Sequence, residues 1–361
     1  MKERKSKFEL LRIVCMLFVV TGHLIPMICD IENLSSGLQY YVGNIYRSFC
    51  LIAVNCFVII SGYFGLNFSV KKLVNLEIQC WFWGVSGLIL AVVSGIHTVE
   101  IKKDILYLFP IITKRYWFVT IYIVLCLLSP ILNYVIHILN QKQFRILMGL
   151  FLVLFYLIPV ISYTVNAPTI TGDSGYGIVN FICLYFVGRY IRIYDCHAKR
   201  IWASVGFLAS CLMMFLANHA MSLLMGFYFN SYVSYDTIFT LAGATFLFLW
   251  CQEWNFQSAI INKIAEYSFS VYIIHMSMFY GTIIFQKAVE ISENTTLWYV
   301  VLFVVPILFY AVSIVLESIR RVVFNKLDSK LVKVTSRGMI GKFLDTQLKE
   351  FIEGYNGYGI K

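Results

Sequence analysis

The sequence carries little charge for its length. Only 13% of its 361 residues are Asp, Glu, Lys or Arg, whereas 60% are hydrophobic and the mean hydropathy is +0.76. Soluble domains carry about 25% charged residues, which keep their surfaces in contact with water. The scarcity excludes a soluble enzyme, a disordered chain and a disulfide-stapled secreted domain, and it predicts a protein that crosses the membrane several times.

Common signatures of metal binding and catalysis are also missing. The ten cysteines include no Cys-x-x-Cys pair, and no two of the six histidines are three or four residues apart. We therefore expect the cysteines to fill space between helices, and we expect no metal site. The sequence also lacks a nucleophile elbow, a P-loop and a Gly-x-Gly-x-x-Gly motif.

Ten apolar segments are long enough to cross a bilayer, for which a helix needs about 20 residues. They are apolar on all sides, which favours helices over the alternating strands of a barrel. The sequence therefore predicts an all-α membrane protein, a single bundle of about ten transmembrane helices. The expected segments are Leu10–Cys29, Tyr40–Tyr63, Leu76–Gly95, Trp117–Leu139, Ile146–Val165, Val179–Tyr194, Ile201–Ala220, Tyr232–Cys251, Ile264–Phe285 and Leu297–Leu316, of which the sixth and eighth are the weakest.

The basic residues orient this bundle. With both termini in the cytoplasm, 22 of the 29 Lys and Arg residues fall in cytoplasmic segments and six in external ones. This bias follows the positive-inside rule and explains the net charge of +10 without nucleic acid, for which no binding motif exists. We expect a basic cytoplasmic N-terminus over residues 1–9, a membrane domain over 10–316 and a basic cytoplasmic tail over 317–361. The first apolar segment is interpreted as a retained helix and not a cleaved signal peptide.

Two ionisable side chains lie within the first span, where such groups are costly and indicate function. Arg12 and His23 are eleven residues apart, so a helix places them on one face and roughly 16 Å apart along its axis. Each also has a simpler explanation, because Arg12 can reach the headgroups and His23 can bond to a neighbouring carbonyl. Their shared face, with Gly22 allowing close approach, favours the functional interpretation.

Weaker candidates are polar or aromatic residues in or beside other spans. They are Asn55, Ser61, Lys71, Lys72, Tyr116, Trp117 and His275. The two lysines are either positive-inside residues or a phosphate clamp, and the aromatic pair is typical of an interfacial belt. A lone histidine in the middle of a span, such as His275, is more often structural.

Several segments, in order, resemble the membrane-bound acyltransferase family 3. KFELLRIVCMLFVVTGHL resembles its first helix, whose hallmark is an Arg, ten residues and a His, matched here by Arg12 and His23. AVNCFVIISGYF, KRYWFVTIYIVLCLLSPILN, FICLYFVGRYIRIY and SFSVYIIHM resemble later stretches. The resemblance covers about residues 6–316 and is closest to stand-alone bacterial members that modify cell-surface polysaccharides.

The resemblance implies an O-acyltransferase of the bacterial plasma membrane. Such enzymes move an acyl group, most commonly acetyl, from cytoplasmic acyl-CoA to a hydroxyl of a surface polysaccharide or lipid-linked glycan. The implied catalytic residues are His23 and Arg12. The implied acetyl-CoA contacts are Arg12, Lys71 and Lys72, where some relatives have arginines. The acceptor contacts expected are Trp117, Tyr116, Asn55 and Ser61.

The sequence leaves the mechanism and one other function open. His23 is either the general base that deprotonates the acceptor hydroxyl or the carrier of an acyl-imidazole. The alternative function is a transporter or flippase of a lipid-linked glycan, with Arg12 and His23 as a relay. No inverted repeat is visible, which disfavours transport. A non-catalytic sensor or scaffold is a third possibility, and the acceptor sugar, the acyl chain and the oligomeric state are open.

Overall fold

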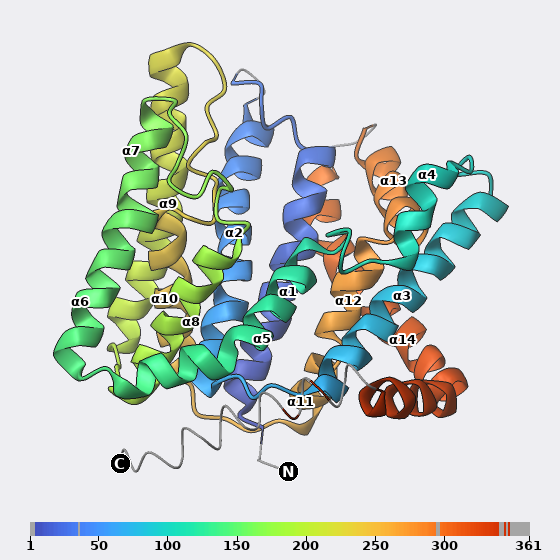
Figure 1. Cartoon of the computed structure of the whole chain (residues 1–361). Coiled ribbons are helices and arrows are strands. Elements are labelled where there is room, and N and C mark those ends of the chain that lie inside the picture. The colour runs from blue at the N-terminus through green and yellow to red at the C-terminus, as the bar shows by residue number, and fades with distance from the viewer. Residues whose placement is uncertain (1–3, 35–36, 294–296, 339–342, 344–345, 347–361) are drawn as a thin grey trace.

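The computed structural model describes residues 4–34, 37–293, 297–338, 343 and 346 (Figure 1). These residues form helices and no strand, which confirms the all-α class. A 3₁₀ turn, Ile105–Leu108, follows α4, and a π-helical turn, Val153–Leu157, joins α6 to α7. The helices are α1 (Ser6–Ile28), α2 (Leu38–Phe64), α3 (Val70–Val93), α4 (Ile101–Asp104), α5 (Trp117–Ile138), α6 (Gln141–Leu152), α7 (Ile158–Thr164), α8 (Ile178–Ile193), α9 (Arg200–Met225), α10 (Ile238–Gln252), α11 (Ala259–Ala265), α12 (Ser268–His275), α13 (Tyr280–Glu293) and α14 (Trp298–Arg337).

The described residues include seven helical segments long and apolar enough to cross a membrane. They are α1, α2, α3, α5, the combined α6–α7 segment, α9 and α14. A bent pair, Ala259–His275 with Tyr280–Glu293, makes eight if it counts as one span. The chain therefore has the helices of a multi-pass membrane protein. The two weakest expected segments correspond to the short helices α8 and α10, of 16 and 15 residues.

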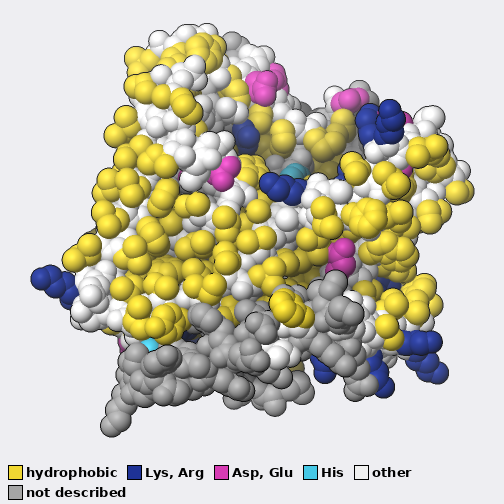
Figure 2. Space-filling model, in the orientation of Figure 1, with side chains coloured by type: hydrophobic (Ala, Val, Ile, Leu, Met, Phe, Trp, Pro, Cys, Tyr) yellow, Lys and Arg dark blue, Asp and Glu magenta, His cyan; other side chains and the backbone are white. Residues whose placement is uncertain are grey.

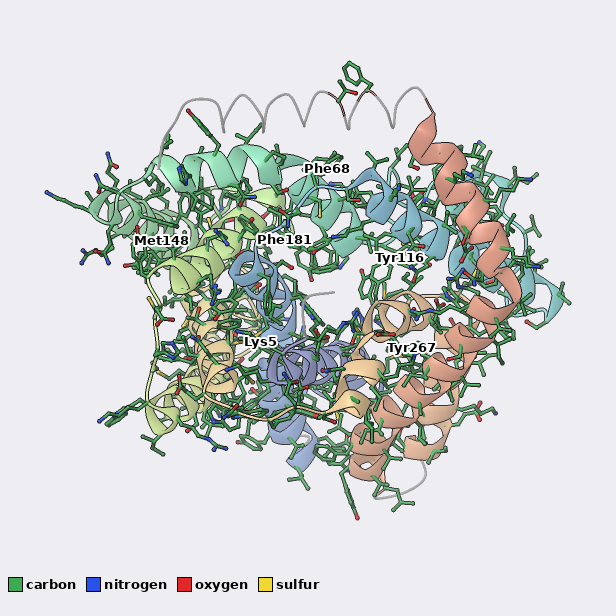
Figure 3. The ribbon with its side chains drawn as sticks, turned by 90° about the horizontal axis from the view of Figure 1, so that it is seen from below. Lys5, Phe68, Tyr116, Met148, Phe181 and Tyr267 are labelled. Carbon is green, nitrogen blue, oxygen red and sulfur yellow. The ribbon has the colours of Figure 1, made fainter. Side chains whose placement is uncertain are left out.

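Helix α1 lies between two half-bundles (Figures 1 and 3). Its first turns, with Phe8 and Leu11, enter a buried core shared with α2, α8 and α10. Its later turns, with Val20 and Leu24, enter a second core shared with α3, α12, α13 and α14. Helix α5 also contributes to both cores. The face of α1 between the two cores, on which Val19 packs against both, is thus positioned at the junction of the halves.

Two glycines set the spacing of α2 and α8 within the first half-bundle. A Cβ added at Gly62 would lie 2.3 Å from the carbonyl oxygen of Tyr185, and one at Gly188 would lie 2.2 Å from that of Ile59. Small residues let helix backbones approach closely, and this contact is a major source of packing energy within membranes. The Ser-Gly-Tyr stretch of the second span is therefore first of all a packing element.

The segment expected as one span over Ile264–Phe285 is broken in the structure. Helix α12 ends at His275, α13 begins at Tyr280, and the bent pair turns by 79°. A Cβ at Gly281 would lie 2.0 Å from the carbonyl oxygen of His275, so only glycine allows this close return of the chain. Hydropathy is continuous across the bend, which is why the sequence did not show it. Irregular backbone at membrane depth is tolerated where it is buried or lines a cavity.

The ends of the chain are more helical than the sequence suggested. Helix α1 begins at Ser6, inside the expected basic N-terminus, and the Ser6 hydroxyl ties this end of the helix to Gln257 by donating a hydrogen bond (2.7 Å). Helix α14 continues past Leu316 to Arg337, because the carboxylate of Glu317 is paired within the helix. The expected tail beyond residue 338 lies outside the described residues, apart from 343 and 346.

Candidate active site

A cavity of about 280 Å³ lies at the junction of the two half-bundles, and we call it the central cavity. Helices α1, α2, α3, α5 and α12 and the end of α11 line it. Most of its walls are apolar, with polar groups at a few positions. The lining residues are Arg12, Met16, Val19, Val54, Phe57, Ser61, Leu76, Phe118, Val119, Tyr122, Ala265, Glu266, Ser268, Phe269 and Tyr272.

One face of α1 runs along this cavity. Arg12, Met16 and Val19 line it with spacings of four and three residues, and His23 follows Val19 by four. Because residues three and four apart share a helix face, His23 continues the same line one turn beyond the cavity. Its side chain is exposed. Figure 2 shows a hollow in the upper half of the molecule in which a histidine and basic side chains are visible.

His23 faces a second histidine that the sequence had assigned a structural role. The ring centroids of His23 and His275 are 5.1 Å apart, with the planes inclined by 54°. His275 is buried, and its Nδ1 donates a hydrogen bond to the carbonyl of Val271 (3.2 Å). This bond assigns the ring hydrogen of neutral His275 to Nδ1 and leaves Nε2 as an acceptor. Among the described residues, that Nε2 has no hydrogen-bond partner.

Arg12 lies at the opposite end of the central cavity from the histidines. Its Nη1 is 2.5 Å from Oε1 of Glu9, a buried carboxylate on the preceding turn of α1. About a third of the Arg12 side chain is exposed, so it is available to a ligand. Arg12 and His23 therefore share one helix face, as expected from their spacing, but occupy different ends of the site.

The expected acceptor residues are not all in one place. Ser61 lines the central cavity, and its hydroxyl donates to the carbonyl of Phe57 (2.9 Å). Tyr116 is buried beside Tyr272, with ring centroids 6.3 Å apart. Burial raises the pKa of the Tyr116 phenol, which is therefore protonated at neutral pH. Neither phenol hydroxyl has a hydrogen-bond partner among the described residues.

Trp117 and Asn55 do not line the central cavity. Trp117 packs against Tyr176 and Tyr235, with ring centroids 4.6 and 5.6 Å away. Asn55 is fully buried, and its side-chain amide donates to the carbonyl of Tyr235 (3.0 Å). This bond ties α2 to the loop before α10, so Asn55 has a structural function in this arrangement.

Lys71 and Lys72 lie in the first turn of α3, not in a loop, and line a separate open groove of about 920 Å³. Distal α14 forms much of the other wall of this groove, which we call the basic groove. Glu266 lines both the basic groove and the central cavity, so the two spaces meet at this residue. Sequence reasoning favoured a structural role for His275 and did not place Glu266 or α14 at the site, since each reaches it only through contacts with residues far away in the chain.

The fold and site define a multi-pass helical membrane protein with a histidine pair beyond one end of an internal cavity and a cationic groove at the other. The model of acyltransferase family 3, described as an acyltransferase domain, matches residues 5–316. The chain therefore belongs to this family, as its motifs indicated. No curated protein and no solved structure matches the chain.

Proposed function

We propose that the protein moves an acyl group, acetyl by default, from cytoplasmic acyl-CoA to a hydroxyl of a cell-surface or lipid-linked glycan. Membership of an acyltransferase family supports acyl transfer in a membrane. The glycan acceptor, the acetyl donor and the bacterial plasma membrane rest on the resemblance of the motifs.

We also propose that the chain has ten spans, the eight candidates together with α8 and α10, and that both termini are cytoplasmic. The basic groove lies where α1 begins, because Arg4, two residues before that helix, pairs with Glu266 in the groove lining (3.4 Å). This position of the basic residues supports the orientation.

The observation that carries this proposal is the histidine pair. Nδ1 of His275 is engaged by a carbonyl, so its Nε2 can only accept a hydrogen bond while the ring is neutral. A neutral His23 that donates to this nitrogen presents its other nitrogen as a base. A base held by a third group is the usual arrangement for activating a hydroxyl, whose own acidity is too low near pH 7.

The proposed reaction balances with these groups. His23 accepts the hydroxyl proton while the hydroxyl oxygen bonds to the thioester carbonyl carbon. The tetrahedral intermediate then collapses, the carbon–sulfur bond breaks, and His23 returns the proton to the departing CoA thiolate. Arg12 lies too far along α1 to take part in this proton transfer and instead positions the donor. An acyl-imidazole on His23 is the alternative course, and it differs by an acylated enzyme that mass spectrometry would detect.

The test uses purified wild-type protein and the variants His23→Ala and His219→Ala with radiolabelled acetyl-CoA and a crude surface-glycan extract. His219 is the matched control, because it bonds to Tyr40 in the first half-bundle and does not line the central cavity. We expect His23→Ala to lose thiol release and glycan labelling while His219→Ala retains both. Transfer by a folded His23→Ala protein would overturn the proposal. Thiol release also separates acyl transfer from the transporter alternative.

A further inference from the structure

We infer that distal α14, residues 317–336, forms one wall of a binding site for the phosphorylated nucleotide end of the acyl donor. This inference rests on the proposed function. The segment lies beyond the residues matched by the family domain, which end at 316. It was expected to be only a basic tail, and the structure instead places it beside α3 across the basic groove.

The basic groove has free positive charge where a phosphate ligand needs it. Of its cations, Lys71, Lys72 and Lys333 form no ion pair among the described residues. The acidic lining residues are both engaged: Asp328 pairs with Arg320 (2.8 Å) and Glu266 with Arg4 (3.4 Å). A phosphomonoester carries about two negative charges near pH 7, so three unpaired lysines suit a ligand with several phosphates.

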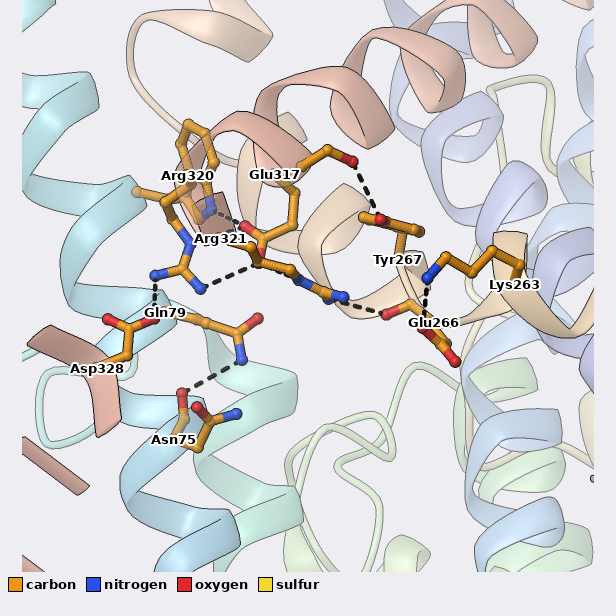
Figure 4. A network of polar contacts seen from close by, with 11 residues as sticks. Asn75, Gln79, Lys263, Glu266, Tyr267, Glu317, Arg320, Arg321 and Asp328 are labelled. Atoms are coloured by element: carbon orange, nitrogen blue, oxygen red, sulfur yellow. Dashed lines mark hydrogen bonds and ion pairs between the residues drawn. The ribbon is translucent and has the colours of Figure 1, made fainter. Parts of the chain in front are cut away.

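A buried network holds the two walls of the groove together (Figure 4). Glu317 is fully buried and accepts hydrogen bonds from Trp83 Nε1 on α3 (2.9 Å) and from Nε of both Arg320 and Arg321 (2.9 Å each). This carboxylate is satisfied from two helices. The network therefore fixes the position of α14, and with it Lys333, relative to the lysines of α3.

The groove also adjoins the central cavity. Nη2 of Arg321 donates to the carbonyl of Glu266 (3.3 Å), and Glu266 lines the central cavity as well. A donor whose phosphates bind in the basic groove can therefore extend its uncharged pantetheine arm past Arg12 into the apolar cavity. The polar lining of the groove and the apolar lining of the cavity match the two chemical halves of CoA.

A lipid headgroup offers the same phosphate chemistry. Apolar side chains are exposed along distal α14, among them Leu327, Leu331 and Val334. They lie on one face of the helix and favour its contact with a membrane surface. The test must therefore distinguish a nucleotide phosphate from an anionic lipid.

The experiment compares acetyl-CoA, acetyl-dephospho-CoA and acetyl-pantetheine as donors for protein in nanodiscs of neutral phosphatidylcholine. We expect Lys333→Gln to raise the KM for acetyl-CoA about tenfold, the worth of one charge-assisted contact of roughly 1.4 kcal/mol, and to leave the KM for acetyl-pantetheine unchanged. Lys330→Gln is the matched control, because Lys330 is exposed on the same helix and does not line the groove. Its KM for acetyl-CoA should stay at the wild-type value.

A binding measurement separates this inference from the proposed function. By calorimetry, adenosine 3′,5′-bisphosphate should bind wild type and His23→Ala equally and Lys333→Gln about tenfold more weakly, whether or not transfer occurs. Equal binding by wild type and Lys333→Gln would overturn the inference. So would a Lys333→Gln effect that appears only in nanodiscs containing phosphatidylglycerol, because the groove would then bind lipid.

Discussion

The two ends of the central cavity differ in the kind of polar side chain that each contains. At the end near Arg12, the polar groups are charged: Arg12 pairs with Glu9 and Arg4 with Glu266, and the unpaired lysines of the basic groove lie beyond them. Near the histidines, the polar groups are imidazoles and phenols. Neither His23 nor His275 forms an ion pair among the described residues.

In the proposed mechanism, this difference separates donor binding from proton transfer. Charge is tolerable near the membrane surface when it is paired or reaches water, and the unpaired lysines of the basic groove would attract an anionic donor. An unsatisfied buried polar atom costs about 1–3 kcal/mol, so its presence calls for an explanation. At the histidine end, Nε2 of His275 and the hydroxyls of Tyr116 and Tyr272 all lack partners among the described residues. In the proposed mechanism His23 donates to Nε2 of His275, and a bound acceptor hydroxyl or thioester carbonyl supplies partners for the two phenols.

The largest effect that sharpens this comparison is expected for His275. Replacement by Ala should lower kcat for acetyl transfer about 10²-fold or more, because His23 would lose the acceptor that the proposed mechanism gives it. The KM for acetyl-CoA should change little, since His275 lies away from the basic groove. Steady-state kinetics and the pH dependence of kcat, measured beside a thermal unfolding curve, check this prediction.

A merely structural histidine gives a different result. His275→Ala would then lower the unfolding midpoint while kcat per folded molecule and its pH profile stayed at the wild-type values. His219→Ala again serves as the control, because it also removes a histidine hydrogen bond, to Tyr40 (2.9 Å), in the other half-bundle.

A smaller effect, at the charged end, is expected for Arg12. Arg12→Gln should raise the KM for acetyl-CoA about tenfold and also destabilise the fold by about 3 kcal/mol, because Glu9 is left buried without its cation. The double variant with Glu9→Gln should recover much of the stability and none of the donor affinity. Kinetics and thermal unfolding of the single and double variants form a double-mutant cycle. Recovery of donor affinity in the double variant would show that Arg12 is only a partner for Glu9.

Features that depend only on neighbouring residues could be predicted from the sequence. Helices α1, α2 and α5 agree with expectation to within a few residues, because apolar length alone defines a span. The common face of Arg12 and His23 follows from helix periodicity, which needs no tertiary information. Ser61 lines the central cavity, whereas Asn55 and Trp117 do not, and the sequence could not distinguish them because a span does not reveal which of its faces meets a cavity.

Contacts between residues far apart in the chain could not be predicted from the sequence. The ring contact between His23 and His275 depends on a bend after α12 that leaves hydropathy unchanged. The length of α14 was underestimated for a related reason. Glu317 and Arg320 look like the start of a solvated tail in sequence, but in the fold each neutralises the other, with side chains almost fully buried.

The smallest effect concerns the network that joins α3 to α14. Trp83→Phe removes one hydrogen bond to Glu317 and keeps most of the buried aromatic surface. Glu317 retains its bonds from Arg320 and Arg321, so the free energy of unfolding should fall by only about 1 kcal/mol. Trp81→Phe is the control, because Trp81 lies on the same helix with an exposed side chain, and its unfolding midpoint should match that of the wild type.

Trp83→Phe also tests whether donor affinity depends on the fixed spacing of α3 and α14, the two walls of the basic groove. If the network fixes Lys333 opposite the lysines of α3, then loosening it through Trp83→Phe should raise the KM for acetyl-CoA about two- to threefold, the equivalent of roughly 0.5 kcal/mol, without changing kcat. A fall in kcat at constant KM would mean that α14 acts on the histidine end instead. The separation of the two ends, with donor binding at one and proton transfer at the other, would then have to be abandoned.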